Sequence, residues 1–122
     1  MFQGLRTAGY QVPDLEKAKA WYTKVLGIEP YFDEPFYVGF NVGGYELGLH
    51  PDPEGGLVGL GGAVPYWGVS DAVAAHDRLI ALGASELLPV RDVGGDIKVA
   101  VVKDPFGNAL GIIENPHFQA SS

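Results

Sequence analysis

Apolar residues along this 122-residue chain follow a strand-then-helix order twice. In the first half, a strand-compatible run over residues 5–12 stops at Pro13, and Asp14 has the side chain expected of a helix N-cap. Apolar residues at helical spacing continue to Leu26, and Gly27 suits a left-handed helix end. Three extended segments are predicted next, over residues 31–33, 36–42 and 45–50.

The second half repeats this order. A strand candidate over residues 64–69 precedes a capping residue, Asp71, and a helical stripe that ends at Leu82 and Gly83. Extended segments are again predicted, over residues 86–89, 97–102 and 109–113. Three sequence matches in the same order indicate an internal duplication: Val12-Pro13-Asp14 with Val69-Ser70-Asp71, Leu26-Gly27 with Leu82-Gly83, and Leu47-Gly48-Leu49 with Leu110-Gly111-Ile112.

The duplication predicts the domain organisation. Residues 1–122 are expected to form a single domain, with repeats at about 4–50 and 63–115 joined by a glycine- and proline-rich linker at about 51–62. One repeat alone is too small to bury its sheet face, so the two are expected to share a core. The predicted fold class is α+β, with two βαβββ modules forming a cupped mixed sheet. The helices are expected to lie on the outer face of this sheet, and a cavity is expected on its other face.

Composition narrows the possible partners. The chain has 8 Lys+Arg against 15 Asp+Glu, a net charge of −7, which disfavours nucleic-acid binding and mildly favours cationic ligands. It has no cysteine, which excludes disulfides and thiolate metal sites within the chain. We find neither an apolar run of about 20 residues nor a secretory signal pattern, so no membrane partner and a cytoplasmic location are predicted.

Two segments carry a family resemblance. They are the stretch from Val12-Pro13-Asp14-Leu15-Glu16-Lys17-Ala18 through Trp21-Tyr22 to Val25-Leu26-Gly27, and the turn Lys103-Asp104-Pro105-Phe106-Gly107-Asn108. With the repeated βαβββ order, they resemble the vicinal-oxygen-chelate superfamily of glyoxalases, ring-cleaving dioxygenases, fosfomycin-resistance enzymes and bleomycin-binding proteins. The resemblance covers nearly the whole chain and implies the glyoxalase-like fold described above.

The resemblance also implies where metal ligands would lie. Metal-dependent members take one ligand from the first strand and one from the last strand of each half. These positions correspond to Thr7 and Val64, and to Gly48 and Gly111. Valine and glycine side chains offer no donor atom, and a threonine hydroxyl alone is a poor ligand for a transition metal. We therefore expect no divalent metal cofactor.

Two residues near Gly48 leave an alternative open. Glu46 and His50 lie two positions before and after it, so a regular strand would point all three to one side. They are candidate catalytic residues for acid–base chemistry, and candidate ligands of an unorthodox metal site.

The two glycines that replace glutamates are expected to make the cavity roomier and less polar. A mostly apolar hollow with a few polar groups is typical of a small-molecule pocket. Strand alternation places Thr7 and Gln11 on the cavity side and Tyr10 under the helix. The candidate ligand-binding residues are Thr7, Gln11, Glu46, Gly48, His50, Val64, Tyr66, Val99, Val101 and Gly111.

Four functions are compatible with these features. The leading hypothesis is metal-free binding of a small organic molecule, as in bleomycin-binding relatives. The alternatives are an acid–base enzyme without metal, a metal-dependent lyase, isomerase or dioxygenase with an unorthodox site, and a regulatory or structural module.

The resemblance also implies a homodimer, with an isologous contact as the default. Trp21 and Tyr22 are expected to serve as core or dimer contacts. Further candidate contacts are Phe2, Phe118, Tyr31, Phe32, Phe36 and Tyr37.

Overall fold

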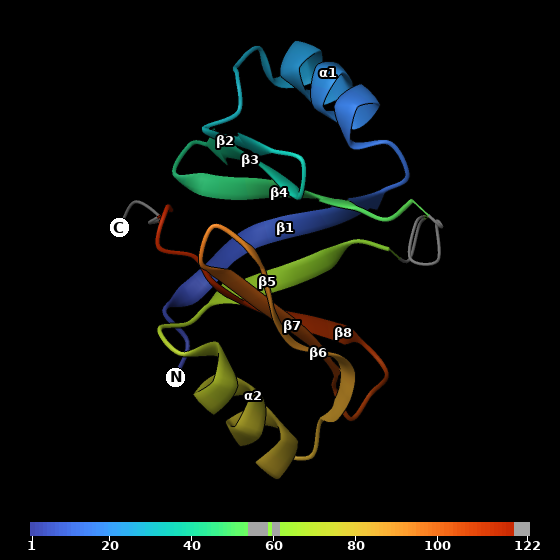
Figure 1. Ribbon diagram of the computed structural model, residues 1–122. Helices are drawn as coiled ribbons and strands as arrows, with labels where there is room; N and C mark the ends of the chain where they lie inside the picture. Colours follow the sequence, from blue (N-terminus) through green and yellow to red (C-terminus); the bar gives the residue numbers. More distant parts are fainter. Residues whose placement is uncertain (54–58, 60–61, 119–122) are drawn as a thin grey trace. The chain divides into compact units, whose positions relative to one another are not determined.

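The computed structural model describes residues 1–53, 59 and 62–118, which contain eight strands and two helices (Figure 1). Residues 54–58 and 60–61 of the predicted linker lie outside the described residues. The elements are β1 (Gly4–Val12), α1 (Leu15–Leu26), β2 (Phe32–Glu34), β3 (Tyr37–Val42), β4 (Tyr45–Pro51), β5 (Val64–Gly68), α2 (Ala72–Ala81), β6 (Ser85–Gly94), β7 (Ile97–Lys103) and β8 (Ala109–Glu114).

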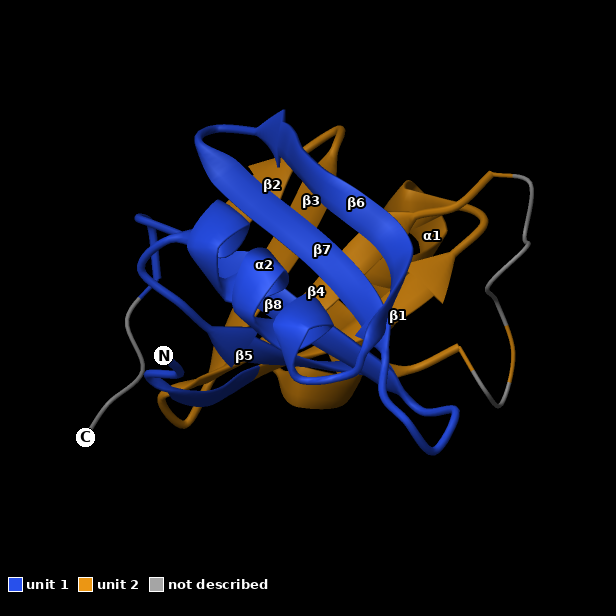
Figure 2. Cartoon of the chain, turned by 90° about the horizontal axis from the view of Figure 1, so that it is seen from below, with its two compact units in different colours: residues 1–6, 64–118 blue, residues 7–63, 119–122 orange. Residues whose placement is uncertain are grey.

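The chain divides into two compact units (Figure 2). Unit 1 contains Met1–Arg6 and Val64–Phe118, and the described residues of unit 2 are 7–53, 59 and 62–63. The boundaries fall within β1 and directly before β5, so unit 1 carries the second predicted repeat and unit 2 carries the first repeat from Thr7 onward. Whether the two units make a single domain stays a prediction.

Unit 2 is a four-stranded mixed sheet with α1 on one face (Figure 1). Its strand order is β2-β3-β4-β1, in which β1 and β4 are parallel and the other pairs antiparallel. Leu15 of α1 packs against Val38, Phe40 and Leu49 of the sheet, and Tyr22 adds to this cluster. This contact fixes which side of each strand faces the helix.

Unit 1 repeats the same arrangement in the order β5-β8-β7-β6, with β5 and β8 parallel. Its core joins the helix to the sheet through Val69, Ala72, Ala75, Leu79, Ala100, Val102 and Ile112. In both units the last strand pairs in parallel with the first, as a duplicated βαβββ module requires. The α+β fold class with two βαβββ modules is confirmed.

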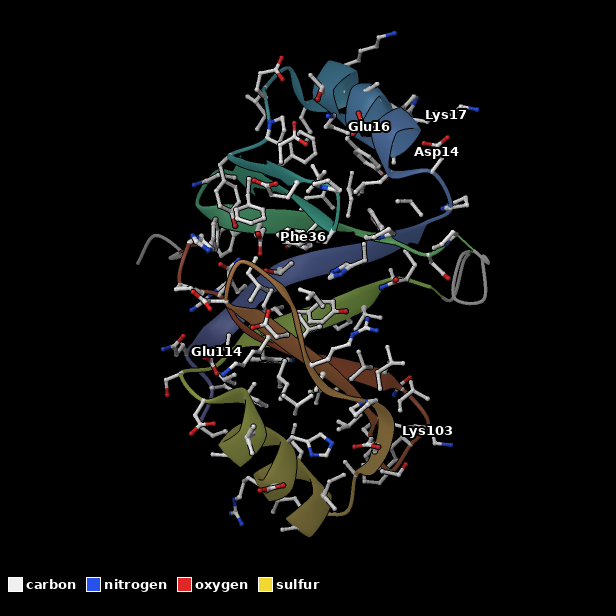
Figure 3. All side chains as sticks on the ribbon, viewed as in Figure 1. Asp14, Glu16, Lys17, Phe36, Lys103 and Glu114 are labelled. Atoms are coloured by element: carbon white, nitrogen blue, oxygen red, sulfur yellow. The ribbon has the colours of Figure 1, made fainter. Side chains whose placement is uncertain are left out.

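The predicted caps are present at both helices. Asp14, which lies next to Lys17 at the start of α1 (Figure 3), accepts a hydrogen bond from the Lys17 backbone N–H at 3.1 Å. Gly27 ends α1 with a φ of 69°. At α2, Asp71 accepts from the Ala74 N–H at 3.0 Å. Glu114 accepts from the Ala72 N–H at 2.9 Å, which joins the end of β8 to the start of α2 (Figure 3).

Strand β6 is longer than the sequence predicts. It spans Ser85–Gly94, whereas the expected segment stopped at Pro89. Proline is tolerated here because β6 is the outermost strand of the unit 1 sheet, where an N–H is dispensable. The pairing with β7 shifts register near Leu88 and Arg91, which marks bulges that a residue pattern does not reveal.

Several aromatic residues lie elsewhere than expected. Trp21 is 58% exposed and therefore not a core residue, whereas Tyr22 is half-buried and stacks on Tyr10. Tyr37 and Phe118 are buried within the chain itself, which removes both as dimer contacts. Among the described residues, no helix has the length and apolar character needed to cross a membrane.

Candidate functional site

The candidate residues of unit 2 lie on the sheet face opposite α1, which we call the far face of unit 2. Leu47 and Leu49 of β4 pack in the helix-side cluster. Since side chains alternate along a strand, Glu46, Gly48 and His50 point to the far face. The predicted common orientation of these three residues is confirmed by their contacts.

Glu46 is the best-defined group on this face. It is 3% exposed and lies opposite Thr7 in the parallel pairing of β1 with β4. The Thr7 hydroxyl donates to one carboxylate oxygen at 2.6 Å, and the Tyr31 hydroxyl donates to the other. Removing a carboxylate from water is costly unless it is hydrogen-bonded, so these two hydroxyls are what makes its burial tolerable.

Most of the buried polar side chains among the described residues lie on the far face of unit 2. Thr7, Glu46 and His50 are three of the four buried polar or charged side chains, and the fourth, Asn115, belongs to unit 1. The His50 ring meets the Tyr37 ring edge-on at a centroid distance of 5.0 Å. Gln11 is half-buried and pairs in register with His50. Buried titratable groups that gather on one surface are typical of functional sites.

Glycines form the floor of the far face. Gly9, Gly48 and Gly39 are directly opposite one another on the adjacent strands β1, β4 and β3. Glycine weakens a strand and often marks a place where another group approaches the backbone closely. Here the group is a tyrosine: a Cβ added at Gly39 would lie 2.8 Å from Tyr31 Cε1, and one added at Gly48 would lie 3.0 Å from Tyr37 Cε1.

The far face of unit 1, opposite α2, has a different character. Tyr66 pairs with Gly111, which pairs with Val101, and Val99 lies on the same side. Val64 is on this side of β5 and is also buried. These positions are therefore apolar apart from the Tyr66 hydroxyl, and Arg91 of β6, which pairs with Val99, adds a positive charge on the same side. Burial raises the pKa of Tyr66 to about 12, while the positive charge of Arg91 lowers it in part.

The four positions at which the family resemblance places metal ligands do not fit a divalent cation. The Thr7 hydroxyl is engaged by Glu46, and Val64 has no donor atom. Gly48 and Gly111 lie under the rings of Tyr37 and Tyr66. In the part of the chain that the structure describes, no three His, Cys, Asp or Glu side chains come together as a metal site.

One expectation about the cavity changes with these contacts. The glycines were expected to leave extra room, but the Tyr37 and Tyr66 rings take up the space beside them. The hollow was expected to be mostly apolar with a few polar groups, and on the far face of unit 2 the buried polar groups gather around Glu46.

Tyr31 and Tyr37 also belong to the far face of unit 2, although their sequence positions indicated only dimer contacts. Tyr37 begins the β3 alternation that places Gly39 on the same face, so a tyrosine two residues before a strand glycine was the available signal. Tyr31 precedes β2 and has no periodic position from which its direction could be read.

Comparisons with known proteins agree with the fold. The sequence matches the Glyoxalase/Bleomycin resistance protein/Dioxygenase superfamily over residues 4–112. No curated protein matches it.

Solved structures with the same fold include methylmalonyl-CoA epimerase from Mycobacterium tuberculosis, at 21% identity and a TM-score of 0.71, covering 93% of this chain and 89% of that one. A Streptomyces coelicolor methylmalonyl-CoA epimerase in complex with 2-nitronate-propionyl-CoA has 16% identity, a TM-score of 0.70 and coverages of 99% and 100%. A superfamily member from Vibrio splendidus 12B01 has 20% identity, a TM-score of 0.58 and coverages of 91% and 99%. At these identities the likeness establishes the fold alone.

Proposed function

Because the chain belongs to the Glyoxalase/Bleomycin resistance protein/Dioxygenase superfamily, we propose that it binds a small organic molecule on the far face of unit 2 without a metal ion. The observation that carries this proposal is the gathering of Thr7, Glu46 and His50, buried on one face above a row of glycines. Replacing a buried charged group by apolar residues of similar volume is often neutral or stabilising, so a binding role explains the buried carboxylate better than stability does.

Glu46 defines the chemistry of such a ligand. An ionised carboxylate has about four acceptor positions, and the protein hydroxyls of Thr7 and Tyr31 use one on each oxygen. The remaining positions suit a ligand N–H or O–H group. The net charge of −7 favours a neutral or cationic molecule over an anionic one. The family name includes bleomycin resistance. Resistance by sequestration needs only affinity for the bound molecule, so it does not require a metal ion.

A thermal-shift panel of metabolites and antibiotics, run with and without a chelator, tests the proposal. We expect a ligand that raises the Tm equally in both conditions. Its affinity should fall by about tenfold or more in Glu46→Gln, because a hydrogen bond to a charged group contributes about 1.5–3 kcal/mol. Glu29→Gln is the matched control, since it removes the same charge from an exposed residue of the same unit.

Two results would count against this binding role. One is a panel with no shift for any compound. The other is a ligand whose affinity drops equally in Glu46→Gln and Glu29→Gln, because general charge rather than the far face would then explain its binding.

The same carboxylate supports a second candidate, an acid–base enzyme that works without metal. Glu46 can accept a proton from a substrate, and the Tyr31 hydroxyl beside it can donate or relay one. Turnover that persists in chelator and is lost in Glu46→Gln would establish this activity. Binding without any chemical change in the ligand would favour sequestration instead.

A further inference from the structure

Tyr31 differs from the other groups that contact Glu46. Its side chain is 36% exposed, while Thr7 and Glu46 are almost completely buried. It lies in the segment between α1 and β2, and its backbone N–H is bonded to the Gly39 carbonyl at 3.0 Å. The backbone bond does not depend on the side chain, so the phenol can leave Glu46 while the main chain stays in place.

The phenol of Tyr31 makes the two kinds of contact that a bound aromatic ligand would make, ring packing and a hydrogen bond. Its ring lies against Gly39, where an added Cβ would come within 2.8 Å of Cε1 and within 2.7 Å of the Glu46 carboxylate. Its hydroxyl donates to that carboxylate. The Tyr31 ring therefore packs on the backbone of Gly39, while the Tyr31 hydroxyl donates to the buried Glu46 carboxylate. The glycine row through Gly48 and Gly9 extends the same floor across two more strands.

From this arrangement we infer that Tyr31 occupies the place of a ligand group, and that the ligand of the far face is a small aromatic molecule with a hydroxyl or amino donor on its ring. The inference rests on the proposed binding function and specifies its ligand class. The ligand displaces the Tyr31 side chain toward solvent and gives Glu46 a replacement donor. A molecule without such a donor would leave a buried carboxylate oxygen short of a hydrogen bond, which selects against it.

Thr7 has the complementary role of a positioning residue. It belongs to β1, is paired in register with Glu46, and donates to the oxygen that Tyr31 does not contact. Because β1 is held in the sheet, this hydrogen bond keeps the carboxylate aimed at the ring site when Tyr31 leaves.

Chemical rescue tests the inference with phenol as the probe. In Tyr31→Ala the space of the side chain is vacated, and we expect phenol to bind at least about tenfold more tightly than to the unchanged protein, as measured by calorimetric titration. Toluene, which has the ring but no donor, should gain much less. Tyr31→Phe is the matched control: the phenylalanine ring still fills the site, so phenol should gain little.

A second variant checks that the donor meets Glu46. In Tyr31→Ala combined with Glu46→Leu, the preference for phenol over toluene should disappear. If that double variant fails to fold, the ratio of phenol to toluene affinity in Tyr31→Ala decides alone. The inference is overturned if Tyr31→Ala gains equal affinity for phenol and toluene, which indicates a non-specific cavity. It is also overturned if neither probe gains affinity.

The outcomes separate this inference from the function it rests on. A panel ligand that binds through Glu46, together with no phenol rescue in Tyr31→Ala, would leave the binding function standing and refute the ligand class. Donor-dependent phenol rescue supports the ring site even where the panel contains no ligand.

Discussion

Tyr66 lies directly against Gly111: a Cβ added at Gly111 would be 2.5 Å from Tyr66 Cδ1. In the other repeat the Tyr37 ring also lies against the last-strand glycine, Gly48, but it reaches that glycine from β3 rather than from the first strand. These two glycines occupy the last-strand positions at which the family resemblance places metal-binding glutamates. In each half of the chain, the last-strand position where the resemblance places a chelating residue is therefore a glycine covered by an aromatic ring.

The contact between Tyr66 and Gly111 predicts how much stability is lost when a methyl group is added at Gly111. Gly111→Ala should lower the free energy of unfolding by about 1–3 kcal/mol, because the buried Tyr66 ring cannot move away without disturbing its neighbours. Denaturant unfolding measures the change. In a Tyr66→Ala background the same substitution should cost much less, since the clashing ring is gone. Equal costs in both backgrounds would refute the contact.

The two hydroxyls on Glu46 should contribute unequally to stability. Thr7→Val removes a hydrogen bond from a fully buried carboxylate oxygen and should cost about 1–3 kcal/mol. Tyr31→Phe should cost less, because water can reach the partly exposed position and replace the lost donor. Denaturant unfolding of both variants tests the order, and the opposite order would contradict this account of the site.

The pKa of Tyr66 predicts a change of stability at alkaline pH. It rises from 10.0 in the unfolded chain to about 12 in the folded one, chiefly through burial. Between these values the unfolded chain loses the phenolic proton and the folded chain keeps it, so the contribution of Tyr66 is complete below pH 10.0 and is lost as the pH rises toward about 12. Ultraviolet absorbance of tyrosinate should show a late-titrating tyrosine that is absent from Tyr66→Phe. No difference between the two titrations would be contrary to this expectation.

Exposed apolar side chains on α1 support the homodimer that we propose from the family resemblance. Trp21 and Val25 are separated by one helical turn, and both are more than half exposed. If an isologous contact forms through this surface, Trp21→Glu should shift the protein toward monomer in light scattering. Lys17→Glu, a charge change on the same helix, is the control. A monomer before any substitution would rule the dimer out.

Local rules were enough to predict most of the fold from sequence. Asp14 and Gly27 bound α1 as their chemistry requires, and the Leu-Gly-Leu and Leu-Gly-Ile matches placed both last strands in the correct register. Strand alternation also predicted that Glu46 and His50 share a face with Gly48.

The remaining features depend on contacts that alternation does not encode. Tyr31 reaches Glu46 from a non-periodic segment, and Tyr37 reaches Gly48 from a neighbouring strand. The length of β6 escaped prediction because the effect of Pro89 depends on whether its strand lies at the sheet edge.

The central claim is that this family fold has exchanged its chelate for a hydrogen-bonding ligand face. Metal content of the purified, tag-free protein tests it most directly, measured by mass spectrometry before and after soaking with zinc, nickel, manganese and iron. We predict far less than one metal ion per chain in every condition. A stoichiometric metal that is lost in Glu46→Gln or His50→Ala would contradict the claim and make the far face of unit 2 a metal centre.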